Sequence, residues 1–76
     1  MKKFIQQTIK DQIANNETPA ISFERFDGAS GHIQFHRNEW AIFFMSACVH
    51  VSKTLNSAVN KLENLHVREN DLFILE

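Results

Sequence analysis

Four histidines and a single cysteine are the side chains of this sequence that suit metal binding. His32 and His36 lie four positions apart, a spacing that places two imidazoles side by side on a helix. The residues around them alternate as in a strand, where four positions span roughly 13 Å, too far for one ion. Cys48, His50 and His66 form no pair at ligand spacing. We therefore expect no metal site and no cofactor.

Acid–base or nucleophilic catalysis would need a reactive side chain held beside a partner group in a pocket. Ser46 and His50 have i, i+4 spacing, and Glu24 falls near His32 or Gln34 if the segments that carry them pair. No nucleophile elbow, phosphate-binding loop or paired-carboxylate motif accompanies them. Ser and His at helical spacing are typical of a solvated helix face. We expect no catalytic residue and no enzymatic activity.

Cys48 is the one cysteine, so the chain cannot form an intramolecular disulfide. It falls on an apolar stripe, which predicts a buried, inert thiol. A single unpaired thiol suits a reducing compartment, and the first residues lack the apolar stretch of a signal peptide. The apolar run Trp40–Val51 is too short to span a bilayer. These features predict a cytoplasmic protein that does not engage a membrane.

The densest apolar run lies within Asn38–Leu65 and predicts one long amphipathic helix. Asn38 is a favoured N-cap residue, and Glu39 would place a negative charge near the positive end of that helix. A polar stripe with the same period would lie on the opposite side of the helix. The apolar residues recur at alternating steps of three and four: Ala41, Phe44, Cys48, Val51, Leu55, Ala58, Leu62 and Leu65.

The same run admits a second interpretation, in which Trp40–Val51 is a strand and only Ser52–Leu65 is helical. Valine and aromatic residues suit a sheet, and the odd positions from Ala41 to Val51 are all apolar. Three observations favour the continuous helix instead. A strand of this length is long for so small a domain, the helical stripe continues through the break, and no Gly or Pro marks a turn.

The segments before this run predict a helix followed by a hairpin. Lys2–Asn15 carries isoleucines at four-residue steps, and Asn15–Pro19 holds residues that end helices. Ala20–Asp27 and His32–His36 alternate apolar and polar residues on either side of a loop that holds both glycines. This pattern predicts two paired strands with one apolar face.

The last residues, Leu72–Leu75, are apolar and predict a short C-terminal strand. A two-stranded sheet is marginal in isolation, so a third strand would stabilise the predicted hairpin. This strand could pair with the hairpin of its own chain or with that of a neighbouring subunit, and both possibilities stay open.

Together these elements predict a single α+β domain over residues 1–76, in the order helix, β-hairpin, long amphipathic helix and short C-terminal strand. A chain of this size buries only about 60% of its surface on folding, and small domains commonly gain stability from a partner subunit. The first half of the predicted long helix is apolar around most of its circumference. We therefore predict a homodimer whose interface contains Trp40, Phe43, Phe44 and Ala47.

The function that follows is protein–protein interaction by a small, non-enzymatic accessory or inhibitor-type protein, which acts as a homodimer and binds another protein of unknown identity. A weak nucleic-acid-binding protein is the alternative. It would use Lys2, Lys3, Lys10, Arg25 and Arg37. The formal net charge of −1 lacks the positive excess that phosphate contacts require, so this alternative is disfavoured.

Overall fold

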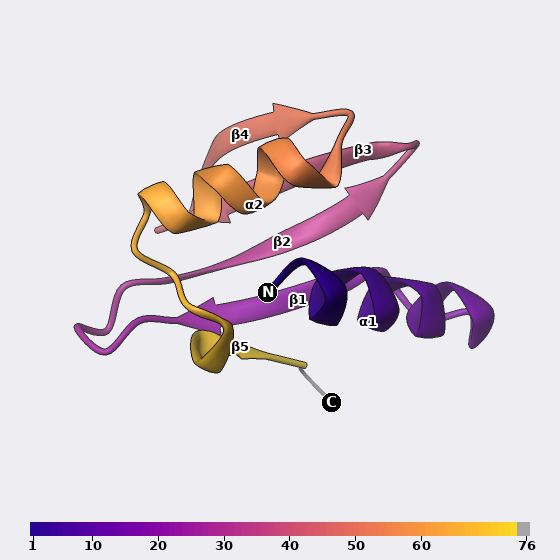
Figure 1. The fold of residues 1–76 in the computed structure, drawn as a ribbon, viewed down its shortest axis with the longest axis horizontal. Helices are drawn as coiled ribbons and strands as arrows, with labels where there is room; N and C mark the ends of the chain where they lie inside the picture. The colour runs from indigo at the N-terminus through magenta and orange to yellow at the C-terminus, as the bar shows by residue number, and fades with distance from the viewer. Residues whose placement is uncertain (75–76) are drawn as a thin grey trace.

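This computed structural model describes residues 1–74, which form a five-stranded antiparallel sheet with two α-helices packed on one face (Figure 1). The predicted α+β class is confirmed. The strand order is β4-β3-β2-β1-β5, so β4 and β5 are the two edges. In chain order the elements are α1 (Lys2–Ala14), β1 (Ala20–Glu24), β2 (Ser30–His36), β3 (Glu39–Phe44), β4 (Ala47–Ser52), α2 (Leu55–Asn64), the 3-10 helix η1 (Glu69–Asp71) and β5 (Leu72–Phe73).

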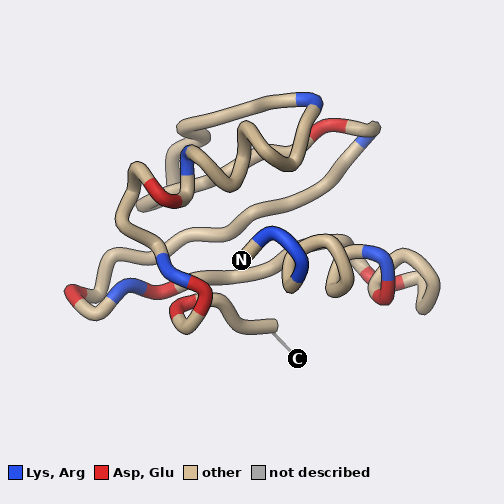
Figure 2. Tube along the Cα trace, viewed as in Figure 1, with Lys and Arg blue, Asp and Glu red and all other residues tan. Residues whose placement is uncertain are grey.

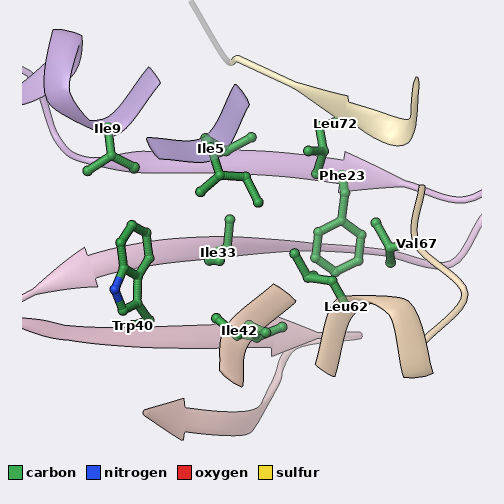
Figure 3. Close-up of a cluster of buried hydrophobic side chains, with 11 residues drawn as sticks. Ile5, Ile9, Phe23, Ile33, Trp40, Ile42, Leu62, Val67 and Leu72 are labelled. Carbon is green, nitrogen blue, oxygen red and sulfur yellow. The ribbon is translucent and has the colours of Figure 1, made fainter. Parts of the chain in front are cut away.

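The hydrophobic core fills the space between the helices and the face of the sheet that they cover (Figure 3). In β1 and β2 every second residue points into it, and the pair Ile21–Ile33 is fully buried at the centre. This is the alternation that predicted the hairpin. The buried apolar residues are Ile5, Ile9, Ile21, Phe23, Ile33, Trp40, Ile42, Ala58, Leu62, Val67 and Leu72.

The predicted long helix over Asn38–Leu65 is wrong in its first half. Residues of β3 and β4 form an antiparallel hairpin there, and only α2 is helical. The second interpretation was closer, because it placed extended chain before a helix, but it missed the turn that divides the extended chain into two strands. Asn38 is not a helix cap either. It lies in the turn between β2 and β3 with φ of 64°.

The physical reason for the error lies in two tight turns and one bulge. Arg37–Asn38 and Met45–Ser46 are two-residue connections in which all four residues have positive φ, between 52° and 70°. This matches the type I′ turn, whose twist suits an antiparallel hairpin. Asn favours such a conformation, whereas Met and Ser do not, so the second turn has no sequence signal. An extra residue in β4, Val49, then shifts the pairing opposite Ile42 and Phe43.

The helix α2 begins at Leu55, and its N-cap is Thr54, whose side chain accepts a hydrogen bond from the backbone N–H of Ser57 at 3.2 Å. Its buried residues are Ala58 and Leu62, both members of the predicted apolar stripe. The stripe is therefore correct over the second half of the run, where packing on the sheet requires an amphipathic helix.

The remaining elements agree with the sequence. The helix α1 buries Ile5 and Ile9, while Ile13 is half-exposed near its end. The C-terminal strand β5 pairs with β1 of its own chain, which decides between the two possibilities left open; Leu75 lies outside the described residues. Neither α-helix of residues 1–74 has the length and apolar character needed to cross a membrane.

Candidate interaction surface on the open face of the sheet

The sheet has a second face that neither helix covers, and side chains from all five strands form a row across it. The pairing registers align Phe73, Ser22, His32, Phe43 and Cys48 from one edge to the other. Their neighbours in β1 to β3 point to the core, so this row faces away from the helices. We call this surface the open face.

A second row on the open face runs beside the first and holds Gln34, Ala41 and Val51. Val51 is 55% exposed although it is a β-branched apolar residue. The apolar side chains are concentrated on the side of β3 and β4, whereas β1 presents Ser22 and Glu24. The open face therefore changes from polar at β1 to apolar at the β4 edge.

The ring of His32 stacks on the ring of Phe43 at a centroid distance of 4.8 Å and an interplanar angle of 14°. This contact holds the Phe43 ring against β2 and leaves it half-buried without any helix above it. A ring that is already fixed by a neighbour loses little conformational entropy when a partner covers it. The His32–Phe43 pair is thus a preorganised aromatic contact point.

A shallow hollow of about 580 Å³ opens at the end of the open face, beside the β3–β4 turn. Gly31 lines the hollow with its backbone, and on the core side a Cβ there would lie only 2.0 Å from the Phe43 carbonyl oxygen and 2.8 Å from the Phe23 ring. Met45 projects at its rim and is 62% exposed. The residues that line the hollow are Ser30, Gly31, His32, Phe43, Met45 and Ser46.

The structure separates the four residues predicted at an interface. Trp40 belongs to the core and is 8% exposed, in contact with the Phe35 ring at 4.7 Å. Phe44 also points to the helix-covered side, where it stacks on Phe23 at 6.1 Å. Phe43 lies on the open face, and Ala47 is exposed in the edge strand β4. Of the four, Phe43 and Ala47 therefore lie on the open face or along the β4 edge, where a partner could cover them.

We define the β3–β4 patch as the apolar residues that are accessible on the open face or along the β4 edge beside it: Phe43, Met45, Ala47, Cys48 and Val51. Cys48 is exposed, so the prediction of a buried thiol is wrong. The error follows from the helix prediction, since on a helix Cys48 would have shared a stripe with core residues, whereas in β4 it pairs with Phe43 on the open face. Met45 and Val51 were not among the predicted interface residues.

No Lys or Arg lies within any strand of the described chain; these residues occupy the helices, turns and connections (Figure 2). On the strands the only carboxylates are Glu24 and Glu39, each at the end of its strand. The centre of the open face therefore holds no Lys, Arg, Asp or Glu side chain. Depletion of charge around aromatic residues is typical of the centre of a protein–protein interface.

The residues of the nucleic-acid alternative do not form one surface. Lys2, Lys3 and Lys10 lie on α1, and Arg37 lies in the β2–β3 turn, at the opposite end of the meander from Arg25. Arg25 is already engaged, because its guanidinium donates to the Leu65 carbonyl at 2.9 Å and to the Asp27 carboxylate.

The loop between β1 and β2 is held by its own carboxylate. Asp27 accepts a hydrogen bond from the backbone N–H of Ala29 at 3.2 Å and pairs with the Arg25 guanidinium. The Ala29 N–H, followed by Arg25, holds the pKa of Asp27 below its ordinary value. These contacts order a loop that carries the 83% exposed ring of Phe26.

A second hollow, of about 820 Å³, lies beside this loop and below the end of α2. It contains charges of both signs, and one ion pair joins the Met1 ammonium to Glu69 at 2.8 Å. Its lining residues are Met1, Arg25, Phe26, Glu63, His66, Val67, Arg68 and Glu69. This mixture of charges favours no one class of ligand.

The candidate catalytic residues also lie apart. Ser46 is in the β3–β4 turn, whereas His50 lies under α2 with its Nε2 at 3.2 Å from the Ser57 hydroxyl oxygen. Sequence reasoning missed this His50–Ser57 contact because it crosses from a strand to a helix. Glu24 pairs with Ser30 rather than with His32. Across residues 1–74 no three His, Cys, Asp or Glu residues gather in a metal-binding group.

Comparisons with protein-family models, with curated proteins and with solved structures returned no match to this chain.

Proposed function

We propose that this chain is a small, non-enzymatic protein–protein interaction module, of the accessory or inhibitor type, that acts as a homodimer through its β3–β4 patch. The observation that carries the proposal is the open face, where apolar side chains and a stacked His32–Phe43 pair surround an uncharged centre. Sheets with one solvated face normally carry polar residues there. Apolar residues at that position cost solubility unless a partner covers them.

The sequence predicts a dimer from a long helix that is apolar around most of its circumference. This helix does not exist in the structure, because much of the apolar run Trp40–Val51 forms the core. The support for a dimer is now the open face of the strands β3 and β4. Trp40, Ile42 and Phe44 face the helices, whereas Phe43 and Val51 lie on the open face, which no helix of residues 1–74 covers. The patch thus keeps two of the predicted interface residues, Phe43 and Ala47.

Self-association can be measured by light scattering across a dilution series from high to low micromolar concentration. We expect wild-type protein to show the mass of a dimer that dissociates on dilution. Val51→Lys adds a charge to the patch at a half-exposed site, and we expect it to weaken association at least tenfold. Asn60→Lys is the matched control, since it adds the same charge at an exposed position of α2.

A monomeric wild-type protein at high micromolar concentration would contradict the proposed homodimer. Equal weakening by Val51→Lys and Asn60→Lys would show that total charge, and not the patch, governs association. Binding to duplex DNA at two salt concentrations tests the rival function, because phosphate contacts lose affinity steeply as salt rises while an apolar contact does not.

We propose a cytoplasmic location for the protein. The exposed thiol of Cys48 supports a reducing compartment, where an accessible cysteine stays unoxidised.

A further inference from the structure

The two edges of the sheet differ in how open they are to pairing. The β5 edge has two residues and is preceded by the carboxylates of Glu69 and Asp71 in η1. The β4 edge has six residues, Ala47–Ser52, and contains no charged residue and no proline. Short strands, charges, proline and β-bulges are the features that normally prevent edge strands from pairing with another chain. Of these two edges, β4 is long, uncharged and free of proline, and its one irregularity is the bulge at Val49.

The bulge at Val49 gives β4 an unusual order of side-chain directions. Cys48 and Val51 both point to the open face, because they pair with Phe43 and Ala41. Val49 and His50 both point to the helix-covered side, where Val49 packs on the core and His50 contacts Ser57 of α2. In a regular strand, residues three positions apart would point to opposite faces.

The two ends of β4 complete this order. Ala47 and Ser52 pair with Phe44 and Trp40, which both face the helices. Along β4, from Ala47 to Ser52, the second and fifth side chains therefore point to the open face, and the other four point to the helix-covered side. This order of faces is the same whether β4 is followed from Ala47 or from Ser52.

We propose that β4 pairs antiparallel with β4 of a second copy of this chain, about a two-fold axis perpendicular to the sheet, in the register that places Cys48 opposite Val51 of the second copy. The inference rests on the proposed homodimer and limits its contact to the part of the β3–β4 patch that lies on β4, so Phe43 stays uncovered for the other protein that the module would bind. A perpendicular two-fold axis keeps the helices of both copies on one side, so opposed residues must share a face. The symmetric order of β4 meets this condition over the whole strand, with Ala47 opposite Ser52 and Val49 opposite His50.

No repulsion between like charges opposes a second copy at this edge. In this register Lys53, the first residue after β4, lies beside Ser46 in the turn of the other copy. The two Lys53 side chains lie at opposite ends of the paired strands, roughly 20 Å apart, so like charges do not meet. The Cys48–Val51 pairs join the two open faces into one continuous surface with apolar contact at its centre.

Disulfide cross-linking tests this register directly. Opposed residues of an antiparallel pair have Cα atoms about 4.5–5.5 Å apart, within the range that a disulfide bridges. In Val51→Cys protein, native Cys48 of each copy would face Cys at position 51 of the other, and mild oxidation should yield a disulfide-linked dimer. Circular dichroism and the melting temperature before oxidation report that the variant, changed at a half-exposed site, is folded.

Two control proteins, each with a single thiol, show whether the cross-link requires both position 48 and position 51. Wild-type protein has only Cys48, and Val51→Cys with Cys48→Ser has only the new thiol; in both, like residues lie diagonally across the paired strands, about 7–8 Å apart, and should not cross-link. Non-reducing electrophoresis distinguishes a 48–51 bond within one chain, which leaves a monomer, from the bond between chains. Non-reducing electrophoresis and peptide mass mapping would identify the 48–51 bridge.

The outcomes separate this inference from the proposed function. A 48–51 bridge that forms only in the single variant supports the register. A folded Val51→Cys protein that light scattering shows to be dimeric but that fails to cross-link overturns the inference and leaves the homodimer intact. Cross-linking of wild-type protein through two Cys48 thiols overturns the register. A monomer at high concentration overturns both proposals.

Discussion

Gly31 in β2 leaves no room for a side chain beside β3, and its replacement by alanine should strongly destabilise the sheet. A Cβ at this position would lie 2.0 Å from the Phe43 carbonyl oxygen and 2.8 Å from the tip of the Phe23 ring. Both neighbours resist displacement: the first is backbone paired in the sheet, and the second is a fully buried side chain. The Phe43 oxygen would have to move about 1 Å to reach the 3.0 Å that real Cβ atoms require.

The loss in free energy of unfolding can be estimated from substitutions that overpack a core. Overpacking a well-filled core typically costs about 1–3 kcal/mol, and a clash with paired backbone belongs at or above the upper end of that range. We therefore expect Gly31→Ala to lower the free energy of unfolding by about 3 kcal/mol or more. For a domain of this size the whole free energy of unfolding is on the order of 4–11 kcal/mol. Each kcal/mol corresponds to about 4–8 °C in Tm, so we expect a loss of at least about 12 °C.

Gly28 provides the matched control. It has φ of 88° in the β1–β2 loop, but nothing lies within 4 Å of the position that a Cβ would take, so alanine there meets backbone strain alone, about 1–2 kcal/mol. Urea unfolding of both variants, with the slope compared to wild type, gives the two values. If Gly31→Ala is no more destabilising than Gly28→Ala, the close approach of β2 and β3 does not constrain residue 31.

Three further predictions test the surface. Native Cys48 should react stoichiometrically with a thiol reagent at low protein concentration and more slowly at high concentration, where the paired β4 edges would cover it; concentration-independent labelling would count against this. Phe43→Ala should leave association nearly unchanged in an edge-paired dimer, because Phe43 lies one strand away from the contact, whereas stacked open faces would lose about 1–3 kcal/mol. The pKa of Asp27 is lowered on folding by the Ala29 N–H and then by Arg25, so these contacts of the carboxylate contribute stability above the ordinary carboxyl pKa that is lost as pH falls through the folded pKa. Tm curves of wild type and Asp27→Asn should therefore converge in acid, and parallel curves would contradict that linkage.

The parts of the fold that were predicted correctly are those with a local signal. The isoleucines of α1 keep a helical period, β1 and β2 alternate around a loop with both glycines, and β5 is apolar after a polar connection. These patterns reflect one buried face and one solvated face, which is the situation that periodicity detects. The strand to which β5 pairs depends on contacts distant in sequence and could not be predicted.

The hairpin of β3 and β4 was missed because three local signals fail together. Met45–Ser46 adopts positive φ without Gly, Asn or Asp, so the turn is not marked. The bulge at Val49 changes the alternation from one half of β4 to the other. Apolar residues on both faces of β3, such as Ile42 and Phe43, then give no period of two, and the combined spacing resembles a helical stripe. Two of the four predicted interface residues were misplaced for the same reason, because Trp40 is buried in the core and Phe44 is half-buried against it.

The residue that most misled the prediction is also the most informative about function. Had β3 carried a polar residue in place of Phe43, its alternation would have matched that of β1 and indicated a strand with one solvated face. Phe43 breaks this rule on a face that no helix covers, and Val51 does so beside it in an edge strand without protecting charges. Departures from local rules are expected where function requires them. Both lie on the β4 side of the sheet, where a second chain can continue it, while the equivalent position in β1 is Ser22 and the other exposed apolar residue of the row, Phe73, lies at the short β5 edge.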